Sequence, residues 1–500
     1  MEQIFDAIVQ AITLQALGMV ALGVFAGITV GAIPGLTSVM AIAVLVPFSF
    51  FMTPINGIPF LLGIHKGALF GGSIPAILIN TPGTAAAAAT TLDGYPLAQK
   101  GEAKSAIQMA LYSSTLGDTF SDIVLILAAF PLAAVALLFG PTEFFALMVL
   151  GLTIISAVTG SSVLKGLLSM LIGILIGLVG QDIISGSERF TFGIANIADS
   201  VGIVPMLIGL FAISEVLIQS EKKIVELANP PESSHLKGGR SLKWIELFQA
   251  KWAILRSSCI GTAIGAIPGT GAAIATFISY ALAKRSSKRP EEYGKGSYEG
   301  VAAAEASNSA VAGADLIPTL TFGIPGSASA AILMGAFMAQ GLRPGPELFE
   351  EQASTMYGIF ALLLVGNPIM LLQGKLLTGL FARLVTIRKS VLVPIILLLC
   401  VVGGFIYQNN IEDVKLALFF GICGYGLRKL KFPLAPLVIA FILTETAEES
   451  MKQALLLSDG DYFVFLTKMA GGFPVSGFLI LLSVFLLGMA IWKKPWAETE

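Results

Sequence analysis

Four Pro-Gly pairs interrupt long apolar stretches of this sequence: Pro34-Gly35, Pro82-Gly83, Pro268-Gly269 and Pro325-Gly326. Proline removes a backbone donor and ends a helix, while glycine lets the chain turn and lets a ligand approach the backbone. A helix broken inside a membrane therefore frees N–H groups that attract anions. We predict a carboxylate site made of the four pairs and of the small or hydroxylic residues that follow them, namely Leu36, Thr37, Ser38, Thr84, Thr270, Gly271 and Ser327.

The residues before two of these pairs are suited to a cation. Asn80 and Thr81 precede the second pair, and Gly323 and Ile324 hold the matching positions before the fourth. Freed carbonyls and one side-chain amide are the oxygen ligands that hard cations prefer. We predict a sodium site there. No other metal and no organic cofactor is expected, because the chain has 2 histidines and its 3 cysteines lack a CxxC spacing.

The segments that carry these pairs are repeated. Gly-Ala-Ile-Pro-Gly occurs at 31–35 and again at 265–269, and the segment 75–84 aligns with 318–327. An internal duplication of this kind decides the fold and has to be recognised first. We therefore predict a first repeat over 1–219 with a hairpin, a broken helix and scaffold helices, a linker over 220–252, and a second repeat plus a C-terminal helix over 253–500.

The composition places these elements in a membrane. Hydrophobic residues make up 55% of the chain and charged residues 12%, and the mean hydropathy is +0.85. Soluble domains carry about 25% charged residues. The predicted fold class is an all-α polytopic membrane protein, because helices satisfy their own backbone groups in lipid. The net charge of −2 offers no basic surface for nucleic acid.

Loop charge predicts the orientation of the two pentapeptides. Lys and Arg residues cluster in 220–256 and 284–295, which places both loops in the cytoplasm. The segment 253–283 between them is then a re-entrant hairpin, since each arm is shorter than the about 20 residues needed to span. The first copy lies in 14–51 and is followed by an uncharged loop, so its flanks are predicted outside. Opposite surroundings for matching segments indicate inverted-topology repeats. The alternative is that 14–33 and 36–51 each cross fully.

Further loops follow the same rule. The turn 93–104 carries two lysines and is predicted inside, whereas 341–351 is acidic and is predicted outside. The apolar segment 432–444 is followed by acidic residues at 445–449, which are also predicted outside. The N-terminus is expected outside, with no secretory signal, and the C-terminus inside.

Ionisable residues within the apolar segments are functional candidates by default. They are Lys66, Asp118, Asp122, Lys165, Glu305 and Asp315. Asp118 and Asp122 share a helix face and would repel each other if both were ionised. Lys165 is expected simply to lie near a helix end. The alternative function is a membrane-embedded enzyme acting on a lipid or isoprenoid with Asp118, Asp122 and Glu305 as catalytic carboxylates. No enzyme is expected, since the chain has no phosphate-loop or zinc-protease motif.

The segments 31–37, 75–103, 265–271 and 323–327 together closely resemble the large membrane subunit (TctA) of the tripartite tricarboxylate transporters. The resemblance implies a permease of the bacterial inner membrane that works with a small four-helix membrane subunit and a periplasmic solute-binding protein. It implies uptake of citrate or another carboxylate, driven by a cation gradient that is usually sodium. The family is also similar in its repeats to elevator-type transporters. No Arg lies in any Pro-Gly break, so the expected clamp consists of backbone dipoles, hydroxyls and the cation.

Overall fold

The computed structural model describes residues 2–159, 162–182, 184–193, 197–221, 239–385, 387, 389–469 and 473–493. Nearly all elements in this part of the chain are helices. The first half contains α1 (Glu2–Ala11), α2 (Leu14–Gly31), α3 (Ser38–Ser49), α4 (Pro54–Gly71), α5 (Ser73–Ile79), η1 (Ala85–Ala87), α6 (Ala88–Gln99), α7 (Ala103–Ala136), α8 (Pro141–Val158), α9 (Val163–Gly177), β1 (Gly180–Gln181), β2 (Glu188–Arg189), α10 (Ile203–Leu207), the π-helical segment η3 (Ile208–Ile213) and α11 (Ser214–Glu221).

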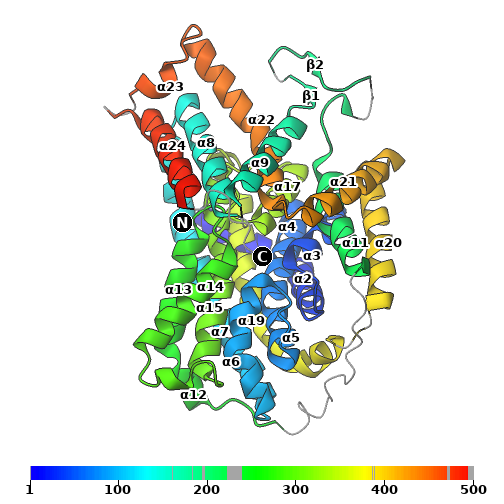
Figure 1. Ribbon diagram of the computed structural model, residues 1–500, viewed down its shortest axis with the longest axis vertical. Helices are drawn as coiled ribbons and strands as arrows, with labels where there is room; N and C mark the ends of the chain where they lie inside the picture. The colour runs from blue at the N-terminus through cyan, green and yellow to red at the C-terminus, as the bar shows by residue number, and fades with distance from the viewer. Residues whose placement is uncertain are drawn as a thin grey trace.

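The elements assigned in the described part of the second half are all helices. It contains α12 (Trp244–Gln249), α13 (Lys251–Gly265), α14 (Gly271–Ser286), η5 (Pro290–Glu292), α15 (Tyr298–Ala314), α16 (Leu316–Phe322), α17 (Ala328–Ala339), α18 (Leu348–Glu351), α19 (Ala353–Leu384), α20 (Lys389–Gln408), α21 (Ile411–Lys429), α22 (Leu434–Leu457), α23 (Val464–Thr467) and α24 (Val475–Lys493). In Figure 1, α6, α7 and α13–α15 lie at one end of the long axis, and α8, α9, α22 and α24 lie toward the other.

Eight helical segments among the described residues are long and apolar enough to cross a membrane. They are Leu14–Gly31, Pro54–Ile79, Ala103–Ala136, Pro141–Val158, Ile203–Glu221, Ala353–Leu384, Val391–Gln408 and Val475–Trp492. The predicted all-α polytopic membrane protein is confirmed. Burial separates these segments, since 89% of the Pro54–Ile79 window is buried but only 17% of the Val475–Trp492 window. The broken helix α4–α5 is therefore central, and α24 lies at the rim.

Three of the four arms beside the two pentapeptides are short. The second copy joins α13 with 15 residues to α14 with 16. The first joins α2 with 18 residues to α3 with 12. At a rise of about 1.5 Å per residue, α3 is well short of the about 30 Å hydrocarbon core, whereas α2 is long enough to cross.

The two broken helices follow the same backbone path. α5 ends at Asn80 with φ 54° and ψ 28°, and α16 ends at Gly323 with φ 67° and ψ 21°. The N–H of each of these left-handed residues bonds to the carbonyl of the proline five residues earlier. The chain then restarts as a helix capped by Thr84 in the first break and by Ser327 in the second. The aligned sequences thus adopt matching local structures.

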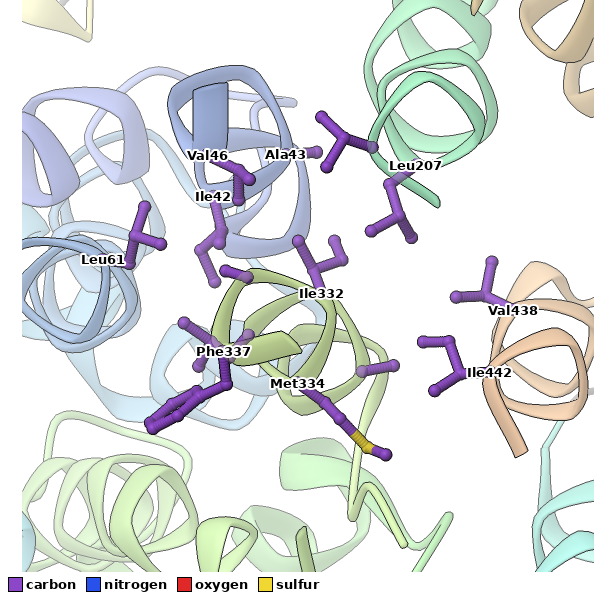
Figure 2. Packing of buried hydrophobic residues seen from close by; sticks show 14 of the residues in the cluster. Ile42, Ala43, Val46, Leu61, Leu207, Ile332, Met334, Phe337, Val438 and Ile442 are labelled. Atoms are coloured by element: carbon purple, nitrogen blue, oxygen red, sulfur yellow. The ribbon is translucent and has the colours of Figure 1, made fainter. Parts of the chain in front are cut away.

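Glycines of α2 and α4 allow these two helices to pack closely against each other. A Cβ on Gly27 would lie 2.3 Å from the carbonyl oxygen of Ile64, and one on Gly67 would lie 2.4 Å from that of Val24. Only glycine permits this approach of α2 to α4. The larger apolar core lies around α17, where Ile332, Met334 and Phe337 lie among side chains of α3, α4, α10 and α22 (Figure 2).

Two predicted loop assignments are wrong. The predicted turn 93–104 is helical up to Gln99, and Asp93 within α6 is fully buried. Its Oδ1 accepts hydrogen bonds from the N–H groups of Gly294, Gly296 and Ser297 at 2.8–2.9 Å, so a residue typical of a turn anchors another loop instead.

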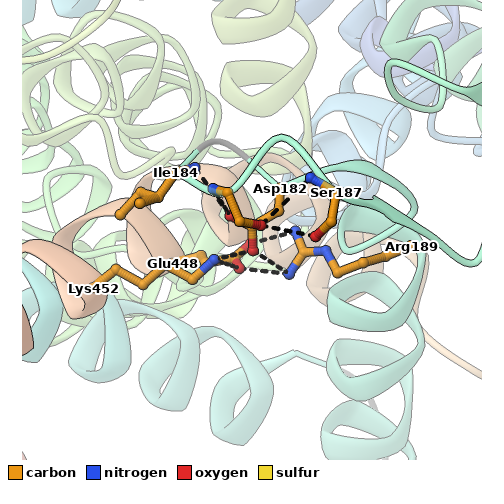
Figure 3. Close-up of polar contacts among 7 residues, drawn as sticks. Asp182, Ile184, Ser187, Arg189, Glu448 and Lys452 are labelled. Carbon is orange, nitrogen blue, oxygen red and sulfur yellow. Dashed lines mark hydrogen bonds and ion pairs between the residues drawn. The ribbon is translucent and has the colours of Figure 1, made fainter.

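The acidic residues 445–449 do not form a loop either, because α22 continues to Leu457. Glu448 pairs with Arg189 from β2 at 2.6 Å and with Lys452 at 2.6 Å one turn on (Figure 3). These ion pairs compensate the charge of Glu448, so the helix continues through the acidic residues.

Several predictions fall on undescribed residues. Most of the predicted linker, 222–238, lies outside the described residues, as do the last residues, 494–500.

Candidate functional site

The first pentapeptide forms a glycine turn that is held by α11. Gly35 has φ 91°, a conformation that L side chains rarely adopt, and its carbonyl accepts a hydrogen bond from Gln219 Nε2. Thr37 caps α3 by accepting from the N–H of Met40 at 3.3 Å. Within the described residues the Thr37 hydroxyl donates to no acceptor. It is half-buried and therefore available to a ligand.

The second pentapeptide turns in the same way but is closed by its own threonine. Gly269 has φ 82°, and its N–H bonds to the carbonyl of Gly326 at 2.9 Å. Thr270 Oγ1 donates back to the carbonyl oxygen of Ile264 at 2.7 Å. The predicted ligand hydroxyl of Thr270 is thus already engaged by the end of α13.

Each turn lies against the broken helix of its own half. A Cβ on Gly83 would lie 2.4 Å from the carbonyl oxygen of Gly31, so the first break packs on the last turn of α2. The N–H of Gly83 bonds to the carbonyl of Gly72 at 3.1 Å. In the second half, the bond between Gly269 and Gly326 makes the equivalent connection. The structure therefore brings Gly83 of the second Pro-Gly pair to the end of α2 just before the first pair, and it joins the third pair directly to the fourth.

The helices that follow the turns cross to the other half. α3 packs against α17, and Ser38 Oγ lies 3.3 Å from Ser329 Oγ. α14 packs against η1 and α6, the helical segments that follow the first break. Predicted site residues from both halves are thus linked through α3 and α14.

The predicted cation ligands lie in two unlike environments. Asn80 and Thr81 are exposed, whereas Gly323 and Ile324 are buried. Ile324 has an exposed fraction of 3%, and its side chain packs on Gly151 of α8. One half of the predicted site is therefore open and the other half is covered.

A buried ionic cluster that sequence reasoning did not assemble lies between α4, α7 and α19. Lys66 forms an ion pair with Asp122, and its Nζ lies 3.5 Å from Asp118 Oδ1. Lys66 also donates to Asn367 Oδ1 at 2.8 Å, and Asn367 donates to Asp122 Oδ2 at 2.7 Å. Asn367 was not predicted, because an amide on a distant helix carries no charge signal.

A second polar group connects α4 to the fourth Pro-Gly pair. Asp315 Oδ2 accepts from Ser327 Oγ at 2.6 Å and lies 4.0 Å from His65 Nε2. Both His65 and Asp315 are buried. The hydroxyl of Ser327, predicted to bind substrate, is therefore occupied by a carboxylate from its own half.

Glu305 has separate partners. It accepts from Ser114 Oγ at 3.1 Å and from the Thr90 hydroxyl, on α7 and α6. Asp118 and Asp122 lie instead beside Lys66, so the three carboxylates of the enzyme alternative have different surroundings. Lys165 lies two residues after the start of α9 and donates to the carbonyl of Leu430 at 3.0 Å, as expected for a residue near a helix end.

One groove among the described residues lies away from these groups. It has a volume of about 770 Å³ between α7, α12 and α13, and it contains none of the predicted site residues. Its walls are mostly apolar side chains such as Leu116, Phe120, Trp244 and Phe248. Such a surface offers few hydrogen-bond donors to a carboxylate, so we do not assign the site to it.

A further group of ion pairs surrounds Glu448 (Figure 3). Arg189 binds Glu448 with two hydrogen bonds of 2.6 and 2.9 Å, and both Arg189 and Lys452 also pair with Asp182. The hydrogen bond from Arg189 is the main reason why the pKa of Glu448 is lowered. This cluster fastens the β1–β2 hairpin to α22 and has a structural role.

Comparison with known proteins identifies the family. A 52.8 kDa protein of Agrobacterium vitis, described as uncharacterized and located in the TAR-I ttuC' 3' region, is 36% identical over 478 residues, which cover 94% of this chain and 92% of that protein. A second uncharacterized A. vitis protein, from the TAR-II ttuC' 3' region, is 36% identical over 231 residues, covering 46% of this chain and 93% of that protein. No solved structure matches. The sequence model described as "Tripartite tricarboxylate transporter TctA family" matches residues 17–439, and the chain therefore belongs to this family.

Proposed function

We propose that this chain is the permease subunit of a binding-protein-dependent tripartite transporter and that it takes up carboxylates such as citrate by cation-coupled symport. The observation that carries the proposal is the pair of broken helices with matching backbone geometry in a chain of the TctA family. Membership of a transporter family also implies that the chain is not an enzyme. The enzyme alternative gains nothing from Glu305, whose partners are separate from those of Asp118 and Asp122.

The proposed carboxylate site comprises the four Pro-Gly pairs and the residues after them. Backbone N–H groups at the restarts of the helices and the hydroxyls of Thr37 and Thr84 supply donors without any Arg. Thr84 accepts from the N–H of Ala87 at 3.3 Å, and its own proton is unused within the described residues. Sodium is the proposed coupling ion, held by the carbonyl and amide oxygens at Asn80, Thr81, Gly323 and Ile324.

We propose that the chain is an elevator-type transporter made of inverted repeats, in which a mobile core moves against a scaffold. The repeats comprise 1–219 and 253–500, and the mobile core carries both hairpins and both breaks. Support comes from the connections of α3 with α17 and of α14 with α6, since these hold parts of both halves together. The scaffold consists of the remaining helices.

The proposed setting is the bacterial inner membrane, with the N-terminus outside and the C-terminus inside. The proposed partners are a small four-helix membrane subunit and a periplasmic solute-binding protein. These assignments rest on the family and, for orientation, on the charge of the loops.

The test is uptake of labelled citrate and other di- and tricarboxylates into proteoliposomes that contain this chain and the two partner proteins. We expect uptake that requires the binding protein and an inward sodium gradient. Thermal-shift measurements on the purified chain, with each carboxylate with and without sodium, identify the substrate beforehand. Uptake that is independent of sodium would contradict the coupling, and absence of uptake for every carboxylate would contradict the proposed function.

A further inference from the structure

Lys66 has no donor left for its second acidic neighbour. Its side chain is 3% exposed, and its ammonium group donates to Asp122 Oδ2, to Asn367 Oδ1 at 2.8 Å and to the carbonyl of Leu363 at 3.3 Å. A lysine ammonium carries three donors. All three are therefore used, although Asp118 Oδ1 lies only 3.5 Å from Nζ.

Asp118 is a fully buried carboxyl group without a hydrogen-bond donor. Within the part of the chain that the structure describes, neither of its oxygens accepts a hydrogen bond, and Oδ1 of Asp122, one helical turn away, accepts none either. A dry carboxylate without donors is strongly disfavoured, and the Lys66 charge is already matched by Asp122. With one ammonium and two carboxylates, the cluster has one negative charge in excess.

The packing of α7 on α15 seals this side of the cluster. A Cβ on Gly117 would lie 2.2 Å from the carbonyl oxygen of Ala306, and one on Gly313 would lie 2.8 Å from Asp122 Oδ1. Backbone therefore lies directly against backbone beside both carboxyl groups. The excess charge has to be neutralised within the cluster itself.

The described residues of the neighbouring elements supply no second fixed cation. α4 contributes His65, whose two ring nitrogens have no hydrogen-bond partner, and α19 contributes the uncharged Asn367. The junction of α15 and α16 contributes Asp315, and α15 contributes Glu305, which is bonded to hydroxyls. These groups add negative charge or none, apart from the imidazole of His65, which lies nearer to Asp315.

We propose that Asp118 carries an exchangeable proton. The carboxylate takes one proton from the aqueous phase, which changes the net charge of Lys66, Asp118 and Asp122 from −1 to zero and turns Asp118 from an acceptor into a group that can also donate. Release of the proton restores the carboxylate. The site is distinct from the proposed sodium ligands, and only its role in coupling rests on the proposed transport function.

Infrared difference spectroscopy of the purified chain tests protonation without transport. We expect a carbonyl stretch of a protonated carboxyl near neutral pH that shifts in D₂O and disappears in Asp118→Asn. Asp118→Glu should retain a shifted band, and the exposed control Asp459→Asn and the buried control Glu305→Gln should leave the original band intact. Wild-type protein without the band, or a band that persists in Asp118→Asn, would overturn the proposal.

Uptake into proteoliposomes tests the coupling role. We expect a pH gradient to stimulate wild-type uptake and to have no effect on Asp118→Asn, which should keep its sodium dependence. If Asp118→Asn instead lost its sodium dependence and kept the wild-type response to pH, Asp118 would bind sodium, and the proposal that it carries a proton would be overturned. If the wild type shows no uptake at all, the proposed function fails, while the infrared band still decides the protonation.

Discussion

The two broken helices share a backbone path but differ in their surroundings. Both breaks end in a left-handed residue and restart at a hydroxyl cap. In the first break Asn80 and Thr81 are exposed, while in the second Gly323 and Ile324 are buried, with Ile324 packed on Gly151 of α8. A transporter built from repeats has to hold its halves differently in any single conformation, since only one side is open at a time. In the proposed transporter, the first half would then be the accessible one in this conformation.

The hydroxyl groups of the two halves also differ in whether their protons are free for a ligand. Thr37 and Thr84 accept hydrogen bonds from their helices and keep their own protons unused within the described residues. Thr270 and Ser327 donate to the carbonyl of Ile264 and to Asp315. The second half therefore satisfies internally what the first half leaves for a ligand.

Removing both breaks should have the largest effect. Pro82→Ala combined with Pro325→Ala lets both helices continue, so we expect uptake to fall to background because the freed backbone groups are lost. The measurement is the initial rate of uptake into proteoliposomes that contain the double variant. Unchanged kinetics would remove the broken-helix site from the proposed function.

Accessibility should separate the halves directly. We expect Thr81→Cys to react readily with a membrane-impermeant maleimide and Ile324→Cys to be protected, because their side chains differ in exposure. The variants are made without the native cysteines Cys259, Cys400 and Cys423. Equal labelling of the two positions would contradict the difference in exposure between the two breaks.

The glycines of the breaks test whether both halves pack equally tightly. A Cβ on Gly83 would lie 2.4 Å from the Gly31 oxygen, and one on Gly326 would lie 2.7 Å from Asp315 Cβ. We expect Gly83→Ala and Gly326→Ala each to lower the free energy of unfolding by about 1–3 kcal/mol, measured by thermal unfolding in detergent. Gly18→Ala is the control, since no atom lies within 4 Å of its added methyl group. A shift as large for the control would point to a general effect of alanine.

Substitution of Thr37 should mainly weaken substrate binding, whereas substitution of Thr270 should mainly lower stability. Thr37→Val removes a free donor and should raise KM about threefold to tenfold, as expected for a hydrogen bond worth about 0.5–1.5 kcal/mol. It also removes the cap of α3, so Thr37→Ser, which keeps both the donor and the cap, is the control and should leave KM nearly unchanged. Thr270→Val removes a bond inside the hairpin and should lower the unfolding free energy by a similar amount with little change in KM. The reverse pattern would mean that the second half is the one open to substrate.

The smallest effect is expected at Glu448, whose ion pairs involve none of the residues of the breaks. Because its pKa is lowered from 4.5 by Arg189, the ion pair stabilises the fold above about pH 4.5, and this contribution is lost as the pH falls toward the folded-state value. Glu448→Gln should cost about 1 kcal/mol or less at neutral pH and flatten the acid limb of Tm against pH. Altered labelling of Thr81→Cys in this variant would connect the ion pairs to the breaks.

Local chemistry explains what could be predicted. Pro-Gly in an apolar stretch breaks a helix wherever it lies, so the four turns and the arms beside them follow from the residues. Asp93 shows where such rules fail, because a residue typical of a turn is buried in α6 as the anchor of the loop 294–297. Its partners are about two hundred residues away and leave no local signal.

The sequence by itself determined the membrane class, the repetition and the positions of the breaks, because composition and backbone restriction act within a few residues. Only the tertiary structure decided that Lys66 pairs with Asp122 and Asn367 while Asp118 lacks a donor, and that one break is exposed while the other is covered. Those features depend on which helices meet, and close packing of α2, α4, α7, α15 and α19 sets that arrangement.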